Sequence, residues 1–360
     1  MHFPQTEAEL AEIICAADLP LAVIGGGTRG VAVEGLQLSS SKMSGVTLYE
    51  PGAMTVVAQA GTPVAEIETL LAAENQRLAF EPMDHRTLLG TQGEPTIGGV
   101  MAANVSGPRR ISVGAARDFL LGVRYVDGMG QIVKNGGRVM KNVTGYDLVK
   151  LMAGSHGTLG VLSEVSFKVL PRPETQATLV LHGLDDASAI DALAKALGSP
   201  FEVSAAAHDP AAGETLLRVE GFDASVKYRL EQLKSLLGGE ISVEDGSIGR
   251  WSAWRDVSAF ADVAGDVWRV SCKPSEGPDL VAKSGAEAAL YDWAGGLIWL
   301  RTTGGHDLRV ALGAYDGHAT LVRGDSFARF EPETAGVARI TCALRARFDP
   351  RGMLNFGLMA

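Results

Sequence analysis

The sequence predicts an α+β protein of two or three domains, and three observations support this fold class. The chain has 360 residues, which is more than one ordinary domain holds. Hydrophobic residues make up 46% of it and charged residues 21%, which excludes disorder and coiled coil. Patterns typical of strands and of helices follow one another along the chain, and Pro171 and Pro173 end the first series. We place the main domain boundary at these prolines.

The first series, residues 1–172, begins with a predicted helix at 5–17, where Thr6 and Glu9 have the spacing of a capping box. A second helix is predicted at 63–77, because a proline opens it and its apolar residues share one face. The other elements expected in this part are strands at 21–24, 46–49, 55–60, 120–127, 131–135 and 161–170, a long glycine-bearing loop at 90–116 and a short helix at 145–152.

The second series, residues 173–335, has the order β-α-β-β-α, which is typical of an antiparallel α+β module. Its helices are expected at 186–198 and 223–237. Residues 305–322 look like paired strands, and the last helix is expected at 333–348. All five tryptophans fall in this half of the chain, and we expect them to be core or interface anchors.

Charge and cysteine content exclude several functions. The net charge of −10 means that the chain has no excess of positive charge to bind a phosphate backbone, so nucleic acid is not an expected partner. Cys15, Cys272 and Cys342 lie far apart and have neither disulfide nor iron–sulfur spacing, which suits a reducing compartment. The first residues are acidic, and no run of about 18 apolar residues exists, so we expect a soluble protein with no transmembrane segment.

Three glycine loops indicate a nucleotide cofactor. Residues 25–30 satisfy G-x-G-x-x-G after a strand, but residues 31–45 lack the helix that a Rossmann fold requires. The second loop spans residues 95–114 and the third spans 154–160. Backbone N–H groups in such loops let a pyrophosphate approach closely. Three of them in one domain favour a flavin dinucleotide over a nicotinamide.

The loop motifs carry a family resemblance. The segments that carry it are GGGT (25–28), TIGG (96–99), ANVSG (103–107), SVGAARD (112–118), KNVTGYDLVKL (141–151), GSHGTLG (154–160) and FDPRGMLNFG (348–357). Together they resemble the vanillyl-alcohol-oxidase (PCMH) type of FAD-binding domain. Within it, the chain is most similar to the FAD-binding E subunits of bacterial glycolate oxidases.

This resemblance implies a two-subdomain PCMH-type FAD-binding domain at 1–172, a ferredoxin-like α+β cap at 173–335, and a C-terminal helix and tail at 336–360 that return to the FAD domain. It implies FAD contacts from Gly25, Gly26, Gly27, Thr28, Thr96, Gly98, Gly99, Asn104, Ser106, Gly107, Gly114, Arg117, Asp118, Gly157, Thr158, Gly160 and Val161. Relatives with covalent flavin often have a histidine in the first loop. That loop reads GGGTRG here, so we expect non-covalent FAD.

The chain also departs from its catalytic relatives. Those enzymes carry two cap histidines and an acidic-His-Gly motif for a metal, whereas His306 and His318 match no metal-ligand spacing. His156 stands where the relatives often have an acidic residue, and Phe356 replaces a proline. We therefore expect no metal site and assign no catalytic residue. Lys141 and Tyr146 are candidates for the isoalloxazine surroundings, and Arg109, Arg110 and Arg117 for anion contacts.

The resemblance implies a subunit of a glycolate oxidase that oxidises glycolate to glyoxylate and passes electrons to a partner. The partners would be a catalytic flavoprotein subunit and an iron–sulfur subunit, in the cytoplasm or held at the inner membrane through them. The 2-hydroxy acid substrate would then act through the complex. Two alternatives stay open: a self-sufficient flavin dehydrogenase for a D-2-hydroxy acid, and a flavin-binding assembly subunit without turnover.

Overall fold

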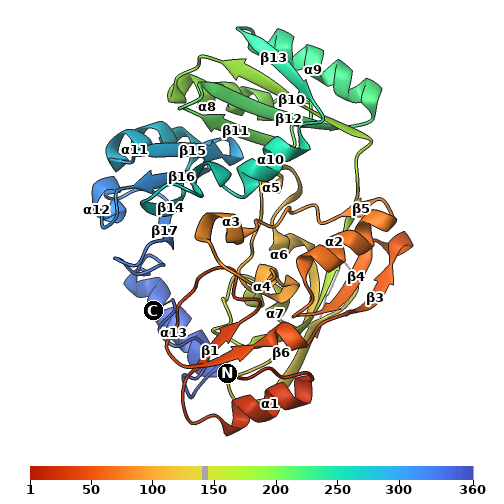
Figure 1. The fold of residues 1–360 in the computed structure, drawn as a ribbon, viewed down its shortest axis with the longest axis vertical. Coiled ribbons are helices and arrows are strands. Elements are labelled where there is room, and N and C mark those ends of the chain that lie inside the picture. Colours follow the sequence, from red (N-terminus) through yellow and green to blue (C-terminus); the bar gives the residue numbers. More distant parts are fainter. Residues whose placement is uncertain (140–144, 360) are drawn as a thin grey trace. The chain divides into compact units, whose positions relative to one another are not determined.

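The structure is a computed structural model that describes residues 1–139 and 145–359. Its contacts divide the chain into two units (Figure 1). Unit 1 comprises Met1–Ser106, Gly114–Arg172 and Pro332–Ala360, and unit 2 comprises Gly107–Val113 and Pro173–Glu331. Two segments therefore differ from the expected domains. Residues 107–113 belong to unit 2, and the chain re-enters unit 1 at Pro332 rather than at residue 336.

Long-range contacts explain why residues 107–113 belong to unit 2. Arg109 forms a buried ion pair with Glu220, and the Nε1 of Trp293 donates a hydrogen bond to the carbonyl of Gly107 (3.1 Å). Ile111 packs against the main apolar core of unit 2. None of these partners is near in sequence, so the local pattern of the second glycine loop gives no sign of them.

Unit 1 contains a five-stranded antiparallel sheet and a small parallel pair. The large sheet has the order β3 (Val46–Glu50), β4 (Thr55–Gln59), β8 (Val161–Lys168), β6 (Leu120–Val126), β7 (Ile132–Gly136). The pair consists of β1 (Leu21–Ile24) and β2 (Leu36–Ser39), and β5 (Gln76–Arg77) pairs with β9 (Leu170–Pro171). β2 lies within residues 31–45, where the sequence predicts no strand. Its four residues, LQLS, are too few to show the alternation of apolar and polar residues that is typical of a strand.

The helices of unit 1 are short. They are α1 (Glu7–Ala16), α2 (Val64–Ala73), α3 (His85–Leu89), α4 (Ile97–Ala102), α6 (Ala116–Phe119), α7 (Leu148–Met152) and α13 (Ala335–Phe348). Thr6 caps α1 by accepting the N–H of Glu9 (3.2 Å), as its spacing predicts. The stretch expected as one loop, 90–116, instead contains α4 and α5 (Arg110–Val113), and α6 begins at its end.

The C-terminal tail joins the core of unit 1. The N–H of Leu21 donates to the carbonyl of Met353 (2.6 Å), and the N–H of Asn355 donates to the carbonyl of Leu21 (3.0 Å). Leu354 is buried in the same cluster as Leu10 and Leu38. The tail therefore acts as a short parallel extension beside β1.

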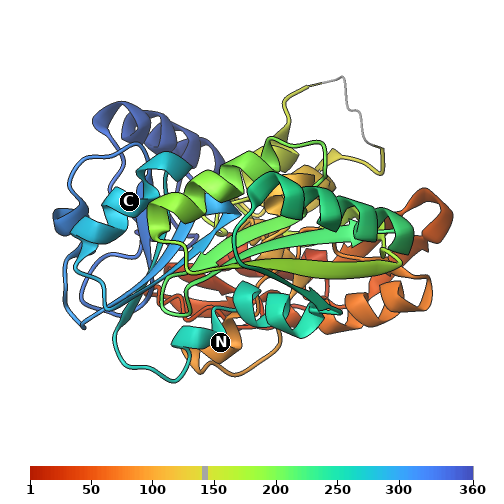
Figure 2. The ribbon, with the colours of Figure 1, turned by 90° about the horizontal axis from the view of Figure 1, so that it is seen from above.

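Unit 2 is an eight-stranded antiparallel sheet with helices on it. The strand order is β13 (Ile241–Asp245), β10 (Thr175–His182), β12 (Glu214–Gly221), β11 (Ala205–Asp209), β15 (Ala288–Asp292), β16 (Leu297–Thr302), β14 (Asp266–Ser271), β17 (His318–Arg323). Figure 2 shows α8 (Asp186–Leu197) and α9 (Asp223–Leu237) side by side over one face. The other helices are α5, α10 (Ile248–Arg255), α11 (Gly277–Ser284) and α12 (Leu308–Leu312).

The expectation of paired strands at 305–322 is wrong in its first half. Asp307 accepts the N–H groups of Arg309 (3.1 Å) and Val310 (3.2 Å), and this cap starts α12 where the sequence LRVAL fits either state. Among the described residues, no helix combines the length and the apolar character that crossing a membrane would require.

Candidate functional site

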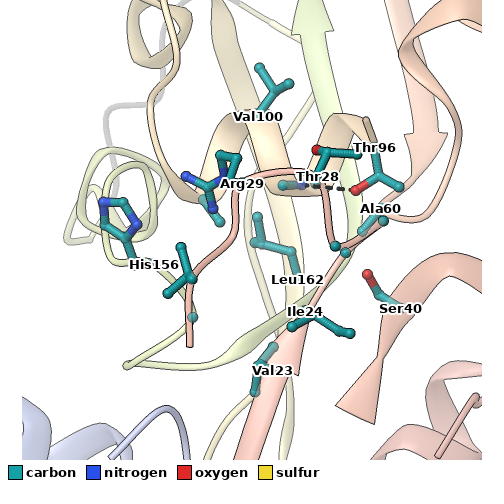
Figure 3. A pocket seen from close by; sticks show the side chains of 18 of the residues that line it. Val23, Ile24, Thr28, Arg29, Ser40, Ala60, Thr96, Val100, His156 and Leu162 are labelled. Carbon is teal, nitrogen blue, oxygen red and sulfur yellow. Dashed lines mark hydrogen bonds between the residues drawn. The ribbon is translucent and has the colours of Figure 1, made fainter. Parts of the chain in front are cut away.

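Unit 1 contains a cavity of about 240 Å³ where the three glycine loops meet (Figure 3). Ten of the predicted site residues line it: Gly25, Gly26, Gly27, Thr28, Thr96, Gly98, Gly99, Gly157, Gly160 and Val161. The other lining residues include Arg29, Gln37, Ser40, Ala60, His85, Val100, His156, Leu162, Asn355 and Leu358. The cavity thus draws on β1, β2, α4, the third loop and the C-terminal tail.

The first loop turns directly out of β1 and is packed too closely for side chains. A Cβ on Gly26 would lie 1.7 Å from the carbonyl oxygen of Glu94, and a Cβ on Gly25 would lie 2.3 Å from the Oγ1 of Thr96. Gly27 has a φ of +73°, which favours glycine. The Oγ of Ser39, at the end of β2, donates to the carbonyl of Gly25 (2.9 Å) and fixes the turn.

The same loop presents donors. The backbone N–H groups of Gly25, Gly26, Gly27 and Thr28 make no hydrogen bond to any residue that the structure describes. Successive N–H groups of this kind form a concave nest that suits an anion. A loop that excludes Cβ atoms and holds unbonded donors fits the pyrophosphate of a dinucleotide.

The second loop begins with a helix cap at the cavity wall. The Oγ1 of Thr96 accepts the N–H of Gly99 (3.3 Å), the bond drawn in Figure 3. Gly98 has a structural reason to be glycine, since its Cβ would lie 2.6 Å from the Cβ of Ala60. Its N–H donates to the carbonyl of Ala60 (2.8 Å), so α4 is held against β4.

The third loop is held by the C-terminal tail. His156 and Gly157 both have positive φ, +52° and +74°. The Nδ2 of Asn355 donates to the carbonyl of His156 (2.8 Å), and its Oδ1 accepts the N–H of Val23 (2.6 Å). One buried side chain therefore ties the third loop to the strand that leads into the first. The sequence motif NFG contains this residue, but only its hydrogen bonds reveal its place at the cavity.

Tyr125 borders the other end of the third loop. A Cβ on Gly160 would lie 2.6 Å from the ring of Tyr125, so glycine lets the loop pack on this side chain. Burial, and to a lesser degree the charge of Asp127, raises the pKa of Tyr125 to about 12. Its phenol is therefore protonated at neutral pH and is not a base.

Six other predicted residues of unit 1 do not line the cavity but brace its loops: Asn104, Ser106, Gly114, Arg117, Asp118 and Thr158. The N–H of Arg117 donates to the Oδ1 of Asn104 (2.8 Å), and the N–H of Ala116 donates to the Oγ of Ser106 (2.9 Å). Asp118 accepts the N–H of Ala115 (2.8 Å). These bonds tie the start of α6 to the second loop.

The remaining predicted residues lie elsewhere. Gly107 is part of unit 2 and does not line the cavity. Tyr146 is 87% exposed, and Lys141 lies outside the described residues. Within the ranges 1–139 and 145–359, no group of three or more His, Cys, Asp or Glu side chains is placed to hold a metal ion.

Comparison with known proteins supports an FAD-binding domain in this chain. Residues 1–136 match the family model described as an FAD binding domain. The chain is 36% identical over 349 residues to the glycolate oxidase subunit GlcE of Escherichia coli K12, covering 94% of this chain and 92% of that protein. It is 34% identical over 146 residues to the glycolate oxidase subunit GlcD of Bacillus subtilis 168, covering 41% of this chain and 30% of that one.

A solved structure shares the fold. An alkyldihydroxyacetonephosphate synthase aligns over 98% of this chain and 76% of its own, with a TM-score of 0.70 and 16% identity. This similarity supports the α+β fold, and the family match over residues 1–136 supports its assignment as an FAD-binding domain of the PCMH type. The chain is therefore a flavoprotein with a PCMH-type FAD-binding domain and belongs to the GlcE family of glycolate oxidase subunits.

Proposed function

We propose that this chain is the FAD-holding E-type subunit of a multisubunit glycolate oxidase, which converts glycolate to glyoxylate and passes the electrons to a partner subunit. The observation that carries the proposal is the cavity of unit 1, where three glycine loops present backbone donors in a chain that aligns with GlcE over 94% of its length. The proposed partners are a catalytic flavoprotein subunit and an iron–sulfur subunit.

The residues that would hold FAD are those of the cavity wall. The N–H groups of Gly25–Thr28 would bind the pyrophosphate, with further backbone contacts from Gly99 and Gly157. Asn104, Ser106, Asp118 and Thr158 would act indirectly by keeping the loops in place. When bound, FAD supplies an acceptor for the two electrons removed from a hydroxy acid.

We further propose that the cofactor is bound without a covalent link. The first loop has no side chain able to form one, since Gly25, Gly26 and Gly27 precede Thr28. The two histidines that line the cavity, His85 and His156, belong to α3 and to the third loop.

The cysteines support the proposal of electron transfer to a partner. Cys15 and Cys342 are exposed, Cys272 is half-buried, and their positions in the sequence match no iron–sulfur motif. The proposal therefore assigns the next redox centre to another subunit. The two alternatives, a self-sufficient dehydrogenase and an assembly subunit, differ from this proposal in the activity that they predict for the isolated chain and for the complex.

The test compares the purified chain with the complex formed on co-expression with its partner subunits. We expect the isolated chain to carry a flavin that can be photoreduced but to reduce an artificial acceptor negligibly when glycolate is added. Activity should appear in the complex and should fall when Gly26 or Gly157 is substituted. Strong glycolate-dependent dye reduction by the single chain would favour a self-sufficient dehydrogenase. A complex that keeps full activity with an emptied flavin site would favour an assembly role.

A further inference from the structure

Unit 2 contains two arginines on one tryptophan ring. The guanidinium carbon of Arg110 lies 4.6 Å from the ring centroid of Trp293, and that of Arg269 lies 5.1 Å from the same centroid. Such cation–π contacts stabilise a guanidinium through its face and do not use its in-plane N–H groups as donors. Because both cations share one ring, two like charges are close neighbours.

The tryptophan is firmly held. The Oδ1 of Asp292 accepts its backbone N–H (2.7 Å), and its Nε1 donates to the carbonyl of Gly107 (3.1 Å). Its φ of +52° is uncommon for a bulky residue, so the surrounding structure sets this conformation. Trp293 thus provides a fixed platform for both guanidinium groups.

Arg269 is the unusual member of this cluster. It lies on β14 between Trp268 and Val270, which point into the helix-covered core, so Arg269 lies on the opposite face of the sheet. Its guanidinium makes no hydrogen bond and no ion pair with any described residue, and the charge of Asp292 is the acidic one that acts on it. Burial, and then the charge of Arg110, lowers its pKa to about 10, so it remains positive at neutral pH.

On β16 the direct cross-strand partner of Arg269 is Trp299, whereas on β17 its neighbours on this face are hydrogen-bonding side chains. Thr320 on β17 is its direct cross-strand partner, and His318 is the next residue on the same face, opposite Ser271. Diagonal neighbours of this kind are within reach of long side chains. His318 is exposed, but partial desolvation of its ring, and then the charge of Arg269, lower its pKa, so its imidazole is neutral at pH 7 and can exchange a hydrogen bond with a hydroxyl.

We propose that Arg269, with Arg110 and the Trp293 platform, forms a binding site for the carboxylate of a small 2-hydroxy acid, whose hydroxyl lies against Thr320 and His318. A guanidinium without a protein acceptor, beside a second cation, is suited to a bidentate carboxylate. The proposal of an anion site rests on the contacts of Arg269. The identity of its ligand rests on the proposed function.

The experiment titrates the isolated flavin-loaded chain with sodium glycolate by calorimetry, with acetate and inorganic phosphate as comparison anions. The test variant is Arg269→Gln. The control is Arg250→Gln, because Arg250 lies in the same unit but is paired with Glu214 and Glu244. We expect glycolate to bind the wild type and the control alike, to bind at least tenfold more weakly to R269Q, and to bind the wild type more tightly than acetate does.

Thermal unfolding separates a ligand-binding role from a structural one. The guanidinium of Arg269 has no hydrogen-bond or ion-pair partner among the described residues and only the ring of Trp293 as a contact for its charge, so the Tm of the ligand-free R269Q chain should lie close to that of the wild type. The rise in Tm that glycolate gives the wild type should disappear. A lower Tm of ligand-free R269Q with unchanged glycolate affinity would overturn the proposal, as would a wild-type chain that does not bind glycolate.

The complex distinguishes this inference from the proposed function. If R269Q leaves the KM for glycolate of the active complex unchanged, the carboxylate site is wrong and the function stands. If the chain binds glycolate through Arg269 but the complex does not oxidise it, the site stands and the function is wrong. If R269Q weakens only co-purification with the partner subunits, the carboxylate belongs to a partner protein and the small-molecule site is refuted.

Discussion

Replacing Asn355 should loosen the cofactor cavity from its C-terminal side. This side chain is 3% exposed and makes three hydrogen bonds: it accepts from the N–H of Val23 (2.6 Å) and donates to the carbonyls of Val23 (3.3 Å) and His156 (2.8 Å). A net contribution of about 1 kcal/mol per bond predicts that Asn355→Gly lowers the free energy of unfolding by about 3 kcal/mol. Asn355→Ala should cost about 1 kcal/mol more, because its φ of +44° strains alanine.

The effect on FAD should follow from the same bonds. Val23 leads into the first loop and His156 opens the third, so losing their common anchor should weaken FAD binding at least tenfold, about 1.4 kcal/mol. Urea titration of the flavin-free chain would give the free energy of unfolding, and quenching of flavin fluorescence would give the Kd for FAD. Asn75 is the matched control, since it is exposed and has a similar φ of +53°.

The result that refutes this reasoning is specific. The free energies of unfolding of Asn75→Gly and Asn75→Ala should differ by about as much as those of the two Asn355 variants, because the backbone strain on alanine is similar. Both Asn75 variants should leave the affinity for FAD unchanged. If the Asn355 variants lose stability without losing FAD affinity, the tail supports the fold but not the cavity. If neither quantity changes, the three hydrogen bonds do not contribute as calculated.

Three further predictions concern the loops and the thiols. Gly26→Ala should yield protein largely without flavin, because the new Cβ would lie 1.7 Å from the carbonyl oxygen of Glu94. The control Gly52→Ala should keep full flavin absorbance near 450 nm, because its Cβ would meet no atom within 4 Å. Equal flavin content in the two variants would contradict the close approach at Gly26. Acid precipitation should release all flavin into the supernatant, and yellow colour in the washed pellet would show a covalent link. At pH 8, the exposed thiols of Cys15 and Cys342 should react quickly with a disulfide reagent. The thiol of Cys272 should react slowly, because burial raises its pKa to about 11 and so suppresses the reactive thiolate. Three equal reaction rates would disprove this.

The loops were predictable because their requirement is local. Gly27 and Gly157 have a positive φ, and Gly26 and Gly98 lie against a neighbouring backbone or strand. Glycine spacing therefore indicated the three loops, and the family resemblance supplied the individual residues. The cap of α1 was predictable for the same reason, since donor and acceptor lie three residues apart.

The features that the sequence did not reveal depend on distant partners. Asn355 belongs to the cavity because of Val23 and His156, which are remote in the chain. Arg109 draws its segment into unit 2 because it pairs with Glu220. The short helix α12 was mistaken for a strand because five residues fit both periods and the Asp307 cap decided the outcome. Local patterns carry no information about such pairings.

The anchoring of β1 by the tail also sets an order of events during synthesis. Val23 and Asn355 are separated by 332 residues, which a ribosome adding about 5–20 residues per second needs roughly 15–65 s to make. During that interval the first glycine loop exists without the side chain that fixes it to the third. Stable capture of the cofactor would therefore wait until Asn355 has been made, and chains that stop before this residue should bind flavin weakly. In such chains the first glycine loop would be more open to proteolysis, because Asn355 would not yet tie the strand that leads into it to the third loop.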